Sequence, residues 1–181
     1  MTRKSIPIRD VCHIAIITAI IVICAQISIQ QPSGVPFALQ SWGVTLSGLI
    51  LGPKKGVLAV LVYIALGAAG VPVFVQGTGG VSVTMRHTGG FIVSFPLLAL
   101  FAGLGAKQGG VVWVLLGVVA GTVINLTVGM FWFSWVMEWN LSASFAAAVA
   151  PFILPEAIKT VILPLISKSI KTALAKERIT L

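Results

Sequence analysis

Long stretches without a charged side chain alternate with short polar connections along almost the whole chain. No Asp, Glu, Lys or Arg occurs between residues 10 and 54, 55 and 86, 86 and 107, or 107 and 138. A helix that crosses a bilayer needs about 20 apolar residues, so each charge-free stretch has room for one or two crossings. The pattern predicts an all-α polytopic membrane protein, with residues 1–181 forming a single integral-membrane domain.

Gly, Pro and polar residues divide these stretches into six predicted transmembrane helices. The second is short, with Phe37 as an alternative, earlier start, and the longest connection, 71–90, is rich in Gly and Thr. The predicted spans are Val11–Ile29, Ser41–Leu51, Gly56–Gly70, Phe91–Ala106, Gly110–Trp132 and Pro151–Ile170.

Composition agrees with this class and excludes a soluble domain. Hydrophobic residues make up 57% of the 181 residues and charged residues 9%, and so small a core cannot bury that much apolar surface. The net charge of +8 is often a sign of nucleic-acid binding. The positive-inside rule explains it better, because Lys and Arg fall in short loops and at the termini. No nucleic-acid partner is expected.

The basic residues also predict the topology. With six spans and a cytoplasmic N-terminus, ten of the twelve basic residues lie in the cytoplasm, and both termini are cytoplasmic. Connections 30–40, 71–90 and 138–150 then meet on the outer side, which predicts a ligand pocket near the outer face. The cytoplasmic residues in this arrangement are Arg3, Lys4, Arg9, Lys54, Lys55, Lys107, Lys168, Lys171, Lys176 and Arg178.

Glu156 and Lys159 are charged residues inside the last apolar stretch. They are three residues apart and therefore share one face of a helix. Ionisable residues at membrane depth are expensive and usually mark a functional site, which makes this pair a candidate for binding a polar ligand. The alternative is a pair that satisfies only itself, with Lys159 reaching toward the interface.

Two further polar residues are candidates for the same pocket. Arg86 lies in the longest outer connection, where its guanidinium group is suited to a ligand carboxylate or, alternatively, to a lipid phosphate. Asn125, inside the fifth span, needs a hydrogen-bond partner, either a ligand or a neighbouring helix. His87 has no second ligand at metal-binding spacing, so no metal is expected.

Small residues predict helix contacts, and the absence of catalytic motifs reduces the number of possible function classes. Gly117 and Gly121 form a GxxxG pattern that predicts close helix packing. Ala15 and Ala19 have the same spacing and predict either packing or a surface for another membrane protein. No phosphate-binding GxxxxGK[ST] motif and no nucleophile–base set occurs. We therefore expect neither ATP hydrolysis nor any other enzyme activity from this chain alone.

Several motifs together resemble the BioY family, the biotin-specific substrate-binding subunits of energy-coupling-factor (ECF) transporters. The resemblance extends over roughly residues 10–170, and the run GAAGVPVF at its centre is the most specific part. The matching segments are GVPFALQ at 34–40, LGPKKG at 51–56, YIALGAAGVPVF at 63–74, TGGF at 88–91 and PFI at 151–153, followed by Lys159.

The resemblance implies a six-helix subunit that captures biotin from outside a bacterial plasma membrane. It implies as partners a transmembrane coupling subunit, contacted through Ala15 and Ala19, and two cytosolic ATPases. Biotin is then the transported ligand, and no cofactor is expected. The implied substrate-binding residues are Phe37, Gln40, Phe74, Gln76, Arg86, Asn125, Glu156 and Lys159.

The chain departs from the family pattern at two of these places. Arg86-His87 stands where many members have Gly-Pro, and Glu156 stands where many have Asp. In the implied site, Glu156 accepts a hydrogen bond from the ureido ring of biotin, and either Lys159 or Arg86 meets an anionic or carbonyl oxygen. Two other hypotheses remain open: a subunit for a different water-soluble vitamin, and a membrane scaffold without a ligand.

Overall fold

The computed structural model describes residues 7–31 and 34–177, with side chains described as far as residue 170. Arg3, Lys4 and Arg178, which contributed to the topology prediction, lie outside the described residues, as do the side chains of Lys171 and Lys176.

The described part of the chain is almost entirely helical, as the charge-free stretches predict. Five of its helical stretches are long and apolar enough to cross a membrane. Short elements connect them at one end of the bundle. The long helices are α1 (Ile8–Gln26), α2 (Gln40–Ala68), α4 (Gly89–Gln108), α5 (Val111–Met137) and α7 (Ile153–Glu177); the short elements are β1 (Ser28–Ile29), β2 (Phe37–Ala38), the 3₁₀ turn η1 (Val75–Gly77), α3 (Val81–Met85), α6 (Leu141–Ala148) and the 3₁₀ turn η2 (Ala150–Phe152).

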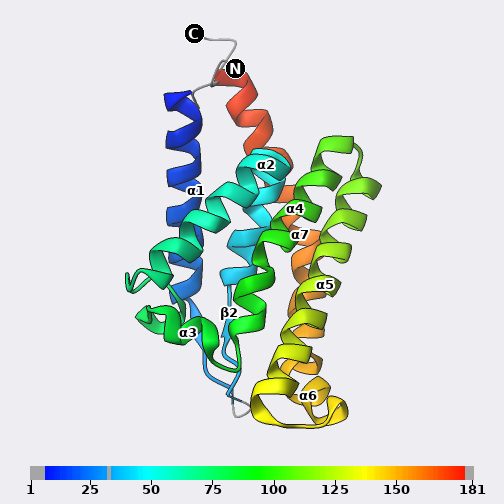
Figure 1. Ribbon diagram of the computed structural model, residues 1–181. Coiled ribbons are helices and arrows are strands. Elements are labelled where there is room, and N and C mark those ends of the chain that lie inside the picture. Colours follow the sequence, from blue (N-terminus) through cyan, green and yellow to red (C-terminus); the bar gives the residue numbers. More distant parts are fainter. Residues whose placement is uncertain (1–6, 32–33, 178–181) are drawn as a thin grey trace, which may run out of the picture.

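Helix α2 is folded back on itself at Gly52 (Figure 1). Gly52 has φ 77° and ψ 179°, a conformation that only glycine adopts readily, and the following Pro53 has no N–H to continue the helix. The two arms are in direct contact, since Ser47 Oγ donates to the carbonyl oxygen of Gly56 at 3.3 Å. The predicted spans 41–51 and 56–70 correspond to these two arms.

Glycines allow α4 to pack closely against both of its neighbours. A Cβ atom at Gly48 of α2 would overlap the carbonyl oxygen of Ala99 in α4. A Cβ atom at Gly117 of α5 would likewise overlap the carbonyl oxygen of Phe101. The GxxxG pattern of α5 therefore serves internal packing, as predicted.

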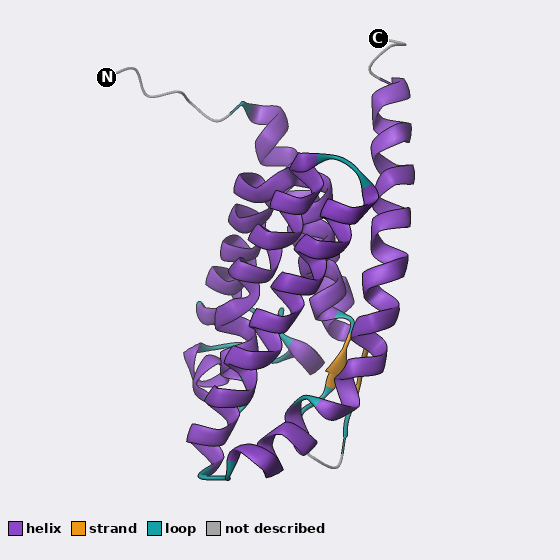
Figure 2. Ribbon diagram, turned by 90° about the vertical axis from the view of Figure 1, so that its right-hand side faces the viewer, coloured by secondary structure: helices purple, strands orange, loops and turns teal. Residues whose placement is uncertain are grey.

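The connections gather at two opposite ends of the bundle (Figure 1). The start of α1, the turn of α2, the α4–α5 connection and the end of α7 lie at one end, whereas β2, α3 and α6 lie at the other. Lys55 Nζ and Asp10 Oδ1, 2.6 Å apart, join the start of α1 to the turn of α2. Figure 2 shows α7 along one side of the bundle, ending at the marked C-terminus.

Several predicted boundaries were wrong. The first span ends at Gln26 because the chain then forms β1, which pairs antiparallel with β2. The connection 138–150, predicted as a loop, contains α6, capped by Asn140, whose side chain accepts from the N–H of Ala143 at 2.8 Å. The fifth helix extends to Met137, and α7 begins at Ile153 after η2.

Candidate ligand-binding site

A cavity of about 240 Å³ opens at the end of the bundle that carries β2, α3 and α6. Its walls come from β2, the first turn of α2, the segment 74–78, residues 86–88 and the halves of α4, α5 and α7 that lie at this end. A space of this size is suited to a small metabolite rather than to a polymer. The arrangement agrees with the prediction that the long connections cover a pocket.

Seven of the eight predicted substrate-binding residues line this cavity. They are Phe37, Gln40, Phe74, Gln76, Arg86, Asn125 and Glu156. The eighth, Lys159, does not line it. Its side chain is fully buried one helical turn beyond Glu156 and forms an ion pair with Oε2 of that residue.

The Glu156 carboxylate is held by side chains from three helices. Ser41 Oγ in α2 donates to Oε1 at 2.8 Å, Thr122 Oγ1 in α5 donates to Oε2 at 3.4 Å, and Lys159 pairs with Oε2. An ionised carboxylate has about four acceptor positions, so these contacts leave one on Oε1. Because Glu156 lines the cavity and its side chain is 12% exposed, this oxygen is placed to accept from a ligand N–H.

Asn125 has the neighbouring-helix partner that its sequence position called for, and it also lines the cavity. Its Nδ2 donates to the carbonyl oxygen of Phe91 at 3.0 Å and to Ser94 Oγ at 2.7 Å, which joins α5 to α4. The same side chain lines the cavity. With both amide protons committed, only its carbonyl oxygen is left to meet a ligand.

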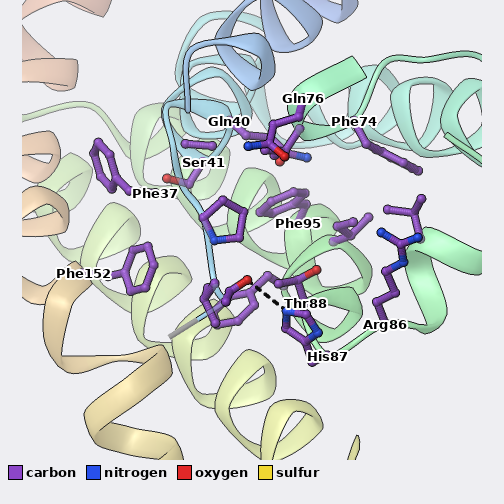
Figure 3. A pocket seen from close by; sticks show the side chains of 18 of the residues that line it. Phe37, Gln40, Ser41, Phe74, Gln76, Arg86, His87, Thr88, Phe95 and Phe152 are labelled. Atoms are coloured by element: carbon purple, nitrogen blue, oxygen red, sulfur yellow. Dashed lines mark hydrogen bonds between the residues drawn. The ribbon is translucent and has the colours of Figure 1, made fainter. Parts of the chain in front are cut away.

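Arg86 lies at the exposed mouth of the cavity, across from Phe37 and Phe152 (Figure 3). Its guanidinium group has no hydrogen bond or ion pair with any described residue, although its backbone oxygen accepts from Trp132 Nε1 at 2.9 Å. The cation is therefore available to an anionic group that enters from the open side.

His87 closes one side of the mouth. Its Nε2 lies 3.0 Å from the carbonyl oxygen of Gly34, and because a carbonyl only accepts, this nitrogen carries the proton. The ring also meets Phe133 edge-on at 5.7 Å. No group of residues suited to a metal ion occurs in the described part of the chain.

The remaining walls are aromatic. The rings of Phe37 and Phe152 lie 6.3 Å apart on one side, Phe74 lies on the other, and Phe95 lies between them (Figure 3); Phe74 and Phe95 are buried. Phe37 and Phe74 are thus placed as the predicted apolar walls. Aromatic walls with a few directed polar groups are typical of small-molecule sites.

The sequence did not reveal Ser41, Thr122 and Tyr63 as parts of the site. Ser and Thr are common in membrane helices, where they often bond to their own backbone, and nothing in their spacing points to Glu156. Tyr63 stood out only as a member of the motif at 63–74. The one available signal was the position of Ser41 next to Gln40.

The fold and cavity define the class: a polytopic helical membrane protein with a small-molecule site near one end. The BioY family model matches residues 1–176. The chain is 39% identical to Biotin transporter BioY of Thermotoga maritima over 90% of this chain and 96% of the relative. It is 33% identical to Biotin transporter BioY of Rhodobacter capsulatus over 90% and 93%.

A solved structure agrees with these relatives. The S-component for biotin from an ECF-type ABC transporter superposes with a TM-score of 0.82 at 26% identity, over 95% of each chain. The protein belongs to the BioY family.

The buried pair yields a test of stability without any ligand. Glu156→Gln should destabilise the protein by about 3–5 kcal/mol, because it leaves the buried Lys159 ammonium without a counter-charge. Adding Lys159→Met should recover most of that loss, since the double variant contains no buried charge. The measurement is thermal unfolding in detergent for the two single variants and the double variant.

The Asp10–Lys55 pair provides the matched control. Lys55 is half-exposed, so the same cycle with Asp10→Asn and Lys55→Met should change stability by about 1 kcal/mol or less. If both cycles change stability by the same amount, the Lys159 ammonium is not a buried charge that Glu156→Gln leaves without compensation.

Proposed function

We propose that this chain captures biotin at the outer face of the cell membrane as the substrate-binding subunit of an ECF-type importer, not as an enzyme. The observation that carries the proposal is the polarity of the cavity. Glu156, Asn125 and Gln40, which are hydrogen-bonded to Ser41, Ser94 and Tyr63 respectively, present acceptor oxygens at its buried floor. The unpaired guanidinium of Arg86 lies at its exposed mouth. The names of the relatives support the choice of ligand.

Biotin matches this polarity when its ureido ring lies on the floor. The ring has two N–H donors, for which Glu156 Oε1 and the carbonyl oxygens of Gln40 and Asn125 are the available acceptors. The valerate tail then points to the mouth, and its carboxylate meets Arg86. Lys159 compensates Glu156 from behind in this arrangement and does not contact the tail.

The test is calorimetric titration of the purified chain with biotin, with riboflavin, thiamin and folate as controls. We expect selective binding of one biotin per chain. Binding of another vitamin in place of biotin would keep the site and replace the ligand. Absence of heat from every vitamin with a folded sample would favour a scaffold, in which the Glu156–Lys159 pair satisfies only itself.

The orientation of the ligand predicts the effect of Arg86→Gln. Biotin affinity should fall about tenfold or more, because a charge-assisted hydrogen bond contributes about 1.5–3 kcal/mol. Affinity for biotinamide, whose tail carries no charge, should change by about twofold or less. Calorimetry with both ligands makes the comparison.

Arg9→Gln is the matched control, since Arg9 is an exposed cation at the opposite end of the bundle. This variant removes the same charge and should leave both affinities unchanged. An equal loss of biotin and biotinamide affinity in Arg86→Gln would contradict the contact between Arg86 and the carboxylate.

We further propose that the two arms of α2 cross the membrane separately, which makes six crossings with both termini in the cytoplasm. The fold-back at Gly52 supports this count. Lys54 and Lys55 at the turn of α2 and Lys107 in the last turn of α4 lie at the end of the bundle opposite the cavity, and the positive-inside rule favours the cytoplasm for that end. The cavity then opens to the outside.

Cysteine labelling in intact cells tests this topology. In a Cys12→Ser, Cys24→Ser background, Ser82→Cys should react with a membrane-impermeant maleimide from outside. Lys107→Cys should react only after the cells are permeabilised. Both positions are exposed, so differences in burial do not affect the comparison, and the opposite labelling pattern would reverse the proposed orientation.

The partners follow from the same proposal: a transmembrane coupling subunit and two cytosolic ATPases that supply the energy. Ala15 and Ala19 are exposed on α1 and line a shallow apolar groove with Val62 and Leu66 of α2. Small residues let another helix approach closely, which supports this groove as the contact with the coupling subunit.

A further inference from the structure

Gln40, Tyr63 and Val73 form a buried hydrogen-bond chain whose directions are fixed by chemistry. The Tyr63 hydroxyl lies 3.1 Å from the carbonyl oxygen of Val73, and a carbonyl only accepts, so the hydroxyl proton points toward Val73. The Tyr63 oxygen must therefore accept at its 2.7 Å contact with Gln40. The amide nitrogen Nε2 of Gln40 consequently faces Tyr63.

This arrangement leaves the Gln40 carbonyl oxygen for the cavity. Oε1 of Gln40 receives no hydrogen bond from a described residue. Unlike Nε1 of Trp42, it is not among the fully buried polar atoms without a partner. The residue is only 5% exposed and lines the cavity. Figure 3 shows Gln40 beside Gln76 on the cavity wall. Gln40 thus presents an acceptor, and not an amide N–H, to a bound molecule.

We propose that Tyr63, which does not line the cavity, is a positioning residue that makes this site selective for ligands with an N–H donor. The inference rests on the proposed function, since the donor in question is a ureido N–H of biotin. A glutamine amide without this contact to a tyrosine hydroxyl can turn its NH₂ group toward the ligand, where two donors, the NH₂ group and the ligand N–H, would face each other. The Tyr63 hydroxyl removes that second orientation.

Tyr63→Phe isolates the hydroxyl, because the ring and its edge contact with Phe74 at 5.5 Å are kept. The variant should bind biotin about tenfold more weakly than the parent chain, the effect of losing one well-formed hydrogen bond to the ligand. Biotin methylated at the ureido nitrogen that faces Gln40 has no N–H there, and its affinity should change by about twofold or less. Both monomethyl isomers are tested, so that each nitrogen is covered.

A control must separate this effect from damage to the cavity wall, because Tyr63 also holds Val73 beside Phe74. Gln26→Leu removes hydrogen bonds from the same wall, to the N–H of Gly77 at 2.9 Å and to the carbonyl oxygen of Phe74 at 3.2 Å, without touching Gln40. Gln26→Leu should change the affinities for biotin and for both methylated biotins by the same factor. A common factor for Tyr63→Phe as well would overturn the proposal.

A double-mutant cycle gives the second criterion. In a Gln40→Leu background there is no amide to orient, so Tyr63→Phe should have no further effect on biotin affinity. A full tenfold loss in that background would overturn the positioning role. Thermal unfolding of each variant identifies any that fails to fold.

Failure of the proposed function is distinguishable from failure of this inference. If the parent chain does not bind biotin, the proposed function is overturned, and the amide orientation is then measured directly by NMR with ¹⁵N-glutamine. The Gln40 side-chain signal, identified by its loss in Gln40→Leu, should exchange its protons slowly with solvent in the parent chain and faster in Tyr63→Phe. Equal exchange rates would overturn the inference.

Discussion

A fully buried ammonium group is the constraint around which the cavity is built. Lys159 is 0% exposed, and an isolated charge at such a position costs several kcal/mol. Glu156 compensates it, and hydroxyl groups from α2 and α5 bind the same carboxylate. The electrostatic requirement of one lysine thus brings three helices together at the floor of the cavity and fixes the carboxylate before any ligand arrives.

The other polar side chains on the floor of the cavity also use their hydrogen-bond donors within the protein. The amide protons of Asn125 are used by α4, and the amide nitrogen of Gln40 faces Tyr63. A buried polar group is costly unless it is paired, so the protein itself takes up the buried amide donors of Gln40 and Asn125, whereas the exposed guanidinium of Arg86 stays open. Carbonyl and carboxylate oxygens have spare lone pairs and can remain open at less cost. When the buried donors of a small polar site in a membrane protein are paired, acceptor oxygens are therefore what remains open on the floor of the cavity.

The sequence predicted the features that stand out against an apolar background. Glu156 and Asn125 were identified because polar residues are rare in membrane helices, and Arg86 because it is a basic residue in a predicted outer connection. The structure brings all three to one cavity. The placement of Lys159 could not be predicted, because only the packing of neighbouring helices decides whether a lysine faces a cavity or lies behind its partner. Its contact with a ligand stays a prediction.

The missed features share a different physical cause. Strands of two residues are too short for any alternation of apolar and polar positions, so β1 and β2 left no pattern. Hydroxyl residues gain a role only from a partner far along the chain. Gln40 and Tyr63 are 23 residues apart, a separation of about 34 Å on a straight helix at 1.5 Å per residue. They meet because Gly52 folds α2 back, so a turn at the far end of the bundle creates the contact that orients a side chain in the cavity.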